Sequence, residues 1–145
     1  MTDALASARP LLVETPILVC TYDIDMHHHV NNAVYIRWLE GLRYEVLRAY
    51  YPPQRLVEQG LMPVLHSTHI VYHRAIRLFD EPLGRMWSSK IGRATLTLEA
   101  EFVVEGFCCA RATQRLMMVH IGTSRAARFP QELIEQFERQ NIPRP

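Results

Sequence analysis

The chain is poor in cysteine, and this excludes a disulfide-stapled protein. Only three of the 145 residues are cysteines, and Cys108 and Cys109 are neighbours whose side chains would point to opposite faces of a strand. No disulfide framework fits an odd number of cysteines arranged in this way. We therefore expect each cysteine to be a small strand hydrophobe rather than a nucleophile.

Charge of one sign and long apolar runs are also missing. Lys plus Arg number 16 and Asp plus Glu 15, a formal charge of +1, whereas nucleic-acid binders are usually strongly basic. Charged residues interrupt every apolar stretch before the ~20 residues that a membrane-spanning helix needs. We expect neither a nucleic-acid nor a membrane partner. The opening MTDALASARPLL lacks the basic start and apolar run of a secretion signal, which predicts a cytoplasmic protein.

The composition is that of an ordinary globular protein. Apolar residues make up 48% of the chain and charged residues 21%. Internal repeats, low-complexity tracts and a dividing linker are absent from the sequence. We expect a single domain over residues 1–145, with a flexible start at residues 1–11.

Hydrophobic periodicity predicts one long helix and five strands. The helix runs from Asn31 until Pro52 and Pro53 stop it, and its apolar arc is wide enough to need a sheet around it. Residues 54–60 are expected to form a loop, and 129–140 a short helix. Strands are expected at about 12–22, 61–78, 86–93, 95–105 and 107–121. The segment 95–105 alternates strictly, so its Thr and Glu residues, Glu101 included, should face water. The pattern predicts an α+β domain with an antiparallel sheet wrapped around its helix.

Polar groups concentrate where the first strand meets the helix. The segment YDIDMHHHVNNAVY at 22–35 holds two acids, three imidazoles and two side-chain amides. A helix N-terminus offers unpaired N–H groups and partial positive charge, which can polarise a carbonyl or hold an oxyanion. A carboxylate just before it can activate water or attack a carbonyl, and Asp23 and Asp25 would share a face of an extended segment. The alternative is that Asp25 or Asn31 only caps the helix.

This segment resembles the signature of hotdog-fold thioesterases of the 4-hydroxybenzoyl-CoA thioesterase-like family. The usual form is Asp-x-Asp-x-x-Gly-His-Val-Asn-Asn-x-x-Tyr, followed by a helix with a Glu and an Arg. The matching residues are Asp23, Asp25, His29, Val30, Asn31, Asn32, Tyr35, Glu40 and Arg43. The segment is also similar to plant acyl-carrier-protein thioesterases, whose Asp, Asn and His fall at Asp25, His27 and His29. His27 replaces that Asn, and His28 replaces the bacterial Gly, which restricts positive φ.

The resemblance implies a hotdog fold, with five antiparallel strands around one central helix, and hydrolysis of acyl thioesters. It implies Asp25 as general base or nucleophile, His29 as its catalytic partner, and backbone amides near His28 to Val30 as oxyanion stabilisers. Secondary catalytic candidates are His27, His28, Asn31 and Glu40. Some branches of the family use a helical carboxylate, although Glu40 can also pair with Arg37 or Arg43. Tyr35 and Trp38 should line the substrate pocket, and acyl preference should depend on Tyr35, Trp38, Leu39 and Tyr72.

The resemblance also implies partners. These are acyl-CoA as substrate, with acyl carrier protein as the alternative carrier, and a homodimer or homotetramer with sheets joined edge to edge. Fifteen of the 16 basic residues are arginines, which suit phosphates. The candidates are Arg74, Arg77, Arg93, Arg111, Arg115, Arg125 and Arg128. We expect no cofactor, and no metal, because three consecutive histidines cannot all face one ion. A non-catalytic acyl-binding module and a hotdog dehydratase remain as alternative functions.

Overall fold

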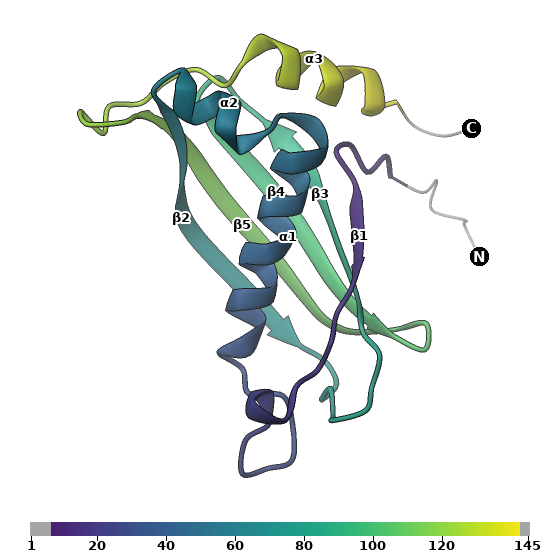
Figure 1. The fold of residues 1–145 in the computed structure, drawn as a ribbon. Coiled ribbons are helices and arrows are strands. Elements are labelled where there is room, and N and C mark those ends of the chain that lie inside the picture. Colours follow the sequence, from purple (N-terminus) through teal and green to yellow (C-terminus); the bar gives the residue numbers. More distant parts are fainter. Residues whose placement is uncertain (1–6, 143–145) are drawn as a thin grey trace.

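In the computed structural model, which describes residues 7–142, one antiparallel sheet curves around one long helix (Figure 1). The strands are β1 (Val13–Pro16), β2 (Leu61–Tyr72), β3 (Leu83–Ile91), β4 (Thr95–Val104) and β5 (Phe107–His120). They lie in the order β1-β3-β4-β5-β2, and all neighbours are antiparallel. The helices are α1 (Val34–Tyr50), α2 (Pro53–Glu58) and α3 (Gln131–Gln140). This arrangement is the hotdog fold and confirms the α+β prediction.

Helix α1 buries the apolar arc that its sequence predicts. Its buried side chains are Val34, Tyr35, Leu39, Leu42 and Val46, while Arg37, Glu40, Tyr44 and Arg48 are exposed. The helix begins three residues after Asn31, and Asn31 closes the turn that leads into it. The Asn31 side-chain oxygen accepts the Ala33 N–H at 2.9 Å, and the Asn31 carbonyl accepts the Val34 N–H at 2.9 Å.

Several predicted boundaries are wrong: the strand expected at 61–78 ends at Tyr72, and two other segments differ for local reasons. The expected loop at 54–60 instead contains α2, because Pro53 stands in the first turn of that helix, where its missing N–H is not needed. The expected strand at 12–22 ends at Pro16, and the chain then turns through a 3₁₀ segment at Thr21–Asp23. Pro16 does lie on the edge strand, as its missing donor requires.

The outer face of β4 differs from the predicted wet surface at Glu101, which is only 6% exposed. Its carboxylate accepts hydrogen bonds from Arg9 at 2.8 Å and from Arg85 at 3.3 Å. The Arg9 guanidinium also lies 3.9 Å from the centre of the Trp87 ring. The alternating pattern fails here because a segment distant in sequence folds over the sheet.

The start of the described chain is packed against the rest. Leu11 is buried, and its N–H donates to the Gln140 side-chain oxygen at 2.7 Å. The Pro10 carbonyl accepts the Ser88 N–H at 2.8 Å. Of the start expected to be flexible, residues 1–6 lie outside the described range.

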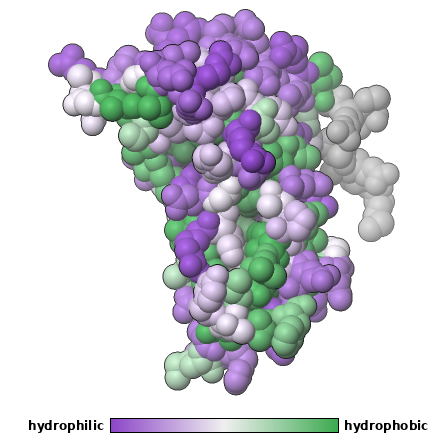
Figure 2. Space-filling model, viewed as in Figure 1, coloured by the Kyte–Doolittle hydropathy of each residue, from purple (hydrophilic) through white to green (hydrophobic). Residues whose placement is uncertain are grey.

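The surface is more polar at one end of the molecule than at the other. Figure 2 shows hydrophilic side chains crowding the end at α2 and α3, with more apolar surface around the lower half of the view. In residues 7–142, no helix combines the length and the apolar character needed to cross a membrane.

Candidate active site

A tight hairpin below the start of α1 carries the three histidines (Figure 1). Ile24 and Val30 form an antiparallel bridge, and the Asp25 N–H donates to the His29 carbonyl at 2.9 Å. The His28 N–H donates to the Asp25 carbonyl at 3.0 Å, and His28 has a φ of 63°. A turn closed by a left-handed residue is the usual form of a three-residue hairpin loop.

This geometry explains why the family pattern has glycine at position 28. The closing residue needs positive φ, which glycine adopts freely and other residues adopt at about 1–2 kcal/mol. His28 takes this conformation in spite of that cost and keeps its imidazole exposed. The loop therefore closes with glycine-like geometry and adds a third imidazole to the surface.

The two acids of the signature differ in what they bind. Asp23 is buried, and its carboxylate accepts hydrogen bonds from Arg37 and from the Cys20 N–H, both at 2.8 Å. Asp25 is partly exposed, and its Oδ1 accepts the His27 N–H at 2.9 Å. The expected shared face is not formed, because the chain at Asp23 is a 3₁₀ turn rather than extended. Asp23 fixes the loop, and Asp25 is the acid left near the surface.

Two adjoining clefts open beside His29. The first, of about 230 Å³, lies between the start of α1 and the end of β2, and its walls include Asn32, Tyr35, Tyr72 and His73. The second, of about 360 Å³, continues past Arg77, Asp80, Glu105 and Cys109. Both clefts are also lined by His29, Arg74 and Ala75. We call the two clefts together the His29 groove, with an aromatic end at Tyr35 and Tyr72 and a charged end at Arg77 and Asp80.

The groove brings together some of the predicted site residues and leaves others outside. His29 and Tyr35 line it, whereas the side chains of Asp25, His27 and His28 lie in the adjacent hairpin. Trp38 does not line either cleft but packs against Tyr35, with ring centroids 5.1 Å apart.

Glu40 is exposed on α1 and forms neither of its expected ion pairs within residues 7–142. Arg37 reaches Asp23 instead, and Arg43 donates to the Gln114 side-chain oxygen at 2.8 Å. Burial lowers the pKa of Arg43, and the charge of Glu40 opposes this shift. Glu40 is thus an exposed carboxylate that makes no ion pair within residues 7–142.

Several groove residues carry no signal in the sequence. His73, Ala75, Asp80 and Glu105 come from the connections that follow β2 and β4. These connections contain no motif, so only pairing of distant strands brings them to the signature. Arg74 and Arg77 did belong to the arginines considered for phosphate binding.

Aromatic rings close one end of the groove. Tyr35 lies with its ring centroid 5.1 Å from that of Tyr72 and 5.4 Å from that of Phe102. Burial raises the pKa of the Tyr35 phenol far above its ordinary value, so this hydroxyl stays protonated. The Tyr72 hydroxyl donates to the Asn32 carbonyl at 3.0 Å.

Cys109 lies in the second cleft without the character of a nucleophile. Burial raises the pKa of the Cys109 and Cys108 thiols, which disfavours the reactive thiolate. Among the residues that the structure describes, no three His, Cys, Asp or Glu side chains come together as a metal-binding group.

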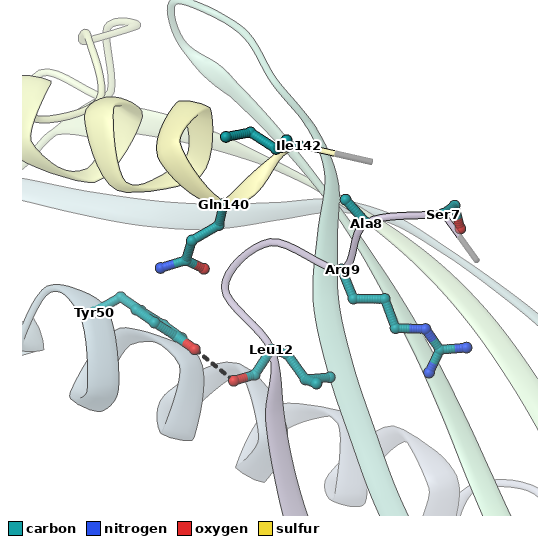
Figure 3. Close-up of a pocket in the computed structure, with 7 residues that line it drawn as sticks. All are labelled: Ser7, Ala8, Arg9, Leu12, Tyr50, Gln140 and Ile142. Atoms are coloured by element: carbon teal, nitrogen blue, oxygen red, sulfur yellow. Dashed lines mark hydrogen bonds between the residues drawn. The ribbon is translucent and has the colours of Figure 1, made fainter. Parts of the chain in front are cut away.

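A further cavity of about 550 Å³ lies at the opposite end of α1 (Figure 3). Its walls include Arg9, Tyr50 and Gln140. The Tyr50 hydroxyl donates to the Leu12 carbonyl at 2.6 Å, as the dashed line in Figure 3 marks. Gln140 accepts the Leu11 N–H, and Arg9 binds Glu101. These polar side chains hold the first described residues against the rest of the fold.

A family model described as the thioesterase-like superfamily matches residues 19–137, which include the hairpin and the whole groove. The chain belongs to the thioesterase-like superfamily. The match confirms the resemblance that the signature indicated. No relative of this superfamily member is found among curated protein sequences.

Solved structures of thioesterases have the same fold. YbaW, a probable thioesterase of Escherichia coli, is 25% identical with a TM-score of 0.77, over 89% of this chain and 98% of that one. A Thermus thermophilus thioesterase complexed with coenzyme A and Zn is 25% identical with a TM-score of 0.76, over 94% and 97%. The DHNA-CoA thioesterase of Staphylococcus aureus is 16% identical with a TM-score of 0.81, over 88% and 89%.

Proposed function

We propose that this member of the thioesterase-like superfamily hydrolyses acyl-CoA thioesters to a free acid and a thiol. One observation carries the proposal: His29 lies in the middle of a groove at the N-terminus of α1, and its backbone is bonded to that of the partly exposed Asp25. A polar residue at that point, a nearby carboxylate and a helix N-terminus are the groups that thioester cleavage needs.

Asp25 supplies the base or the nucleophile. As a base, its carboxylate takes a proton from water, the water oxygen attacks the thioester carbon, and the carbon–sulfur bond then breaks. The sulfur leaves with the electron pair and takes up a proton. As a nucleophile, Asp25 attacks the same carbon and forms an anhydride that water cleaves, which gives the same products. The His29 imidazole orients the carboxylate or the substrate carbonyl.

The oxyanion role falls to one of the three amides that the signature indicates. The His28 N–H already donates to the Asp25 carbonyl, and the Val30 N–H donates to the Ile76 carbonyl at 2.8 Å. The His29 N–H has no backbone acceptor within residues 7–142. We assign the developing negative charge of the carbonyl oxygen to this amide and to the positive end of α1.

The charged end of the groove suits the thiol carrier. Arg74 and Arg77 line it, and the Arg74 guanidinium is held 4.3 Å from the centre of the Phe107 ring. Guanidinium groups bind phosphates in fixed geometry, so coenzyme A is the carrier that this end fits best. The coenzyme A complex of the similar Thermus thermophilus thioesterase supports this choice. Acyl carrier protein is the alternative carrier.

Strand β2 supports a dimer joined edge to edge. It is an edge strand of twelve residues, against four in the edge strand β1 at the other side of the sheet. Its side chains Met62, Val64 and Val71 are exposed although they are apolar. A long apolar edge pairs readily with another chain. Analytical ultracentrifugation tests this part of the proposal, which predicts a dimer or tetramer and fails if the protein is a monomer.

Thiol release from a panel of acyl-CoAs and the matching acyl carrier proteins tests the activity itself. The proposal predicts turnover of acyl-CoA, followed with a thiol reagent. A thermal shift with acyl-CoA but no thiol release would instead identify an acyl-binding module. Water loss from 3-hydroxyacyl-CoA without thiol release would identify a dehydratase.

A further inference from the structure

Tyr72 stands at the end of edge strand β2 and walls off the aromatic end of the His29 groove. Its ring meets that of Tyr35 edge-on, at 79° between the planes, and its hydroxyl is bonded to the Asn32 carbonyl. These two contacts tie the last residue of the sheet edge to the first residues of α1. The ring therefore closes the gap between helix and sheet at that point.

The sheet beneath this ring is made of small side chains. Tyr72 pairs with Ala110 on β5, and Ala110 pairs on its other side with Phe102 on β4. Paired residues share a face, so both rings flank one buried methyl group. The next pair along the same face is Ala100 with Ala112, both buried. The aromatic rings of Tyr72 and Phe102 fill the space above these alanines, and the Phe102 ring is fully buried.

The open part of the aromatic end is small as a consequence. The cleft between α1 and β2 has about 230 Å³. Pockets for drug-sized ligands run to roughly 300–1,000 Å³. An acyl group that enters past His29 meets the Tyr35 ring, which is only 2% exposed, and the Tyr72 ring beside it.

We propose that Tyr72 is the specificity-determining residue that limits the acyl group to a short chain or a single ring. The inference rests on the proposed thioesterase activity and deepens it by naming the substrate class. The acyl group lies at the aromatic end, the sulfur lies near His29, and the carrier leaves along the charged end. Of the rings that close the aromatic end, Tyr72 is the exposed one, at 41%, so its removal opens the gap with little loss of core.

The test compares kcat/KM for butyryl-, benzoyl- and decanoyl-CoA in the wild type and in Tyr72→Ala. The wild type should favour butyryl- and benzoyl-CoA. Tyr72→Ala should raise the decanoyl-to-butyryl ratio of kcat/KM at least about tenfold, since each accommodated methylene adds binding energy in an apolar pocket. Tyr72→Val keeps a residue suited to a strand and should raise the same ratio by less, which guards against a misfolded alanine variant.

Two controls separate ring size from other effects. Tyr72→Phe removes the hydrogen bond to Asn32 but keeps the ring, so it should keep the wild-type ratio. Val71→Ala changes the next residue, which is 42% exposed on the opposite face of the strand, and should also keep it. If the wild type cleaves butyryl-CoA and neither Tyr72→Ala nor Tyr72→Val raises the ratio, the inference fails and the proposed activity stands. A wild type that cleaves decanoyl-CoA as well as butyryl-CoA also overturns it. A wild type that cleaves no acyl thioester overturns both.

Discussion

The two ends of α1 each carry a hollow of comparable size, and only one of them is suited to chemistry. At the C-terminal end, Tyr50, Gln140 and Arg9 border about 550 Å³, but each is bonded within the chain. At the N-terminal end, the His29 groove is divided into smaller clefts, and it lies beside the positive end of the helix and the partly exposed Asp25. Cavity size therefore does not locate the active site here. The polar groups that the fold leaves available to a substrate locate it instead.

Asp25→Asn should have the largest effect and sharpens this contrast most. An asparagine oxygen can still accept the His27 N–H, so the loop stays closed while the charge is lost. We expect kcat to fall by about 10²–10⁴, the usual contribution of a general base or acid. Thiol release from butyryl-CoA measures it, and an unchanged melting temperature shows that the fold is intact.

Glu40→Gln is the matched control, because Glu40 is the signature carboxylate that is exposed on α1. It should retain wild-type turnover. The reverse result, with Glu40→Gln inactive and Asp25→Asn active, would move the catalytic acid from the hairpin to the helix.

Glu101→Gln should affect stability rather than activity. Burial alone would raise the pKa of Glu101, but the guanidinium groups of Arg9 and Arg85 outweigh it and hold the pKa below its ordinary value. The ionised carboxylate thus stabilises the fold above the ordinary pKa of Glu, and this stability is lost as pH falls through the lowered one. We expect the variant to lose about 1–2 kcal/mol of unfolding free energy at pH 7 and less at pH 3. Urea denaturation at the two pH values measures both losses, and equal losses would contradict the assignment.

Gln140→Ala tests the purely structural role of the cavity at the C-terminal end of α1. The variant leaves the buried Leu11 N–H without its acceptor, which should cost about 1 kcal/mol and lower the melting temperature by roughly 3–4 °C. The kcat/KM for butyryl-CoA should be unchanged. Loss of turnover at an intact fold would show that this end of α1 takes part in the reaction.

His28→Gly should have the smallest effect and the opposite sign. Glycine removes the strain of positive φ but adds flexibility to the unfolded chain, so we expect a net gain of about 0.5–1 kcal/mol. His28→Val should destabilise the protein, since a branched side chain fits that conformation poorly. Thermal unfolding measures the stability of both variants. A less stable glycine variant would mean that the imidazole itself holds the hairpin.

The parts of the fold that could be predicted depend on neighbours within a few residues. The apolar arc of α1 repeats every three to four residues, so periodicity within one segment is enough to detect it. Glu101 could not be predicted in the same way, because the residue that covers it, Arg9, is 92 positions away. The resemblance singled out Asp25 for catalysis, but the burial of Asp23 could not be predicted, because it depends on the 3₁₀ turn at that residue.

The sequence by itself determined the long helix, the polar segment before it and membership of the family, since these follow from periodicity and from a contiguous motif. Only the tertiary structure decided where a substrate can lie. Pairing of β2 with β5 sets Tyr72 beside Ala110 and brings the connections after β2 and β4 together at His29. Such a groove belongs to no single segment, because it is formed by strands whose neighbours in space are distant along the chain.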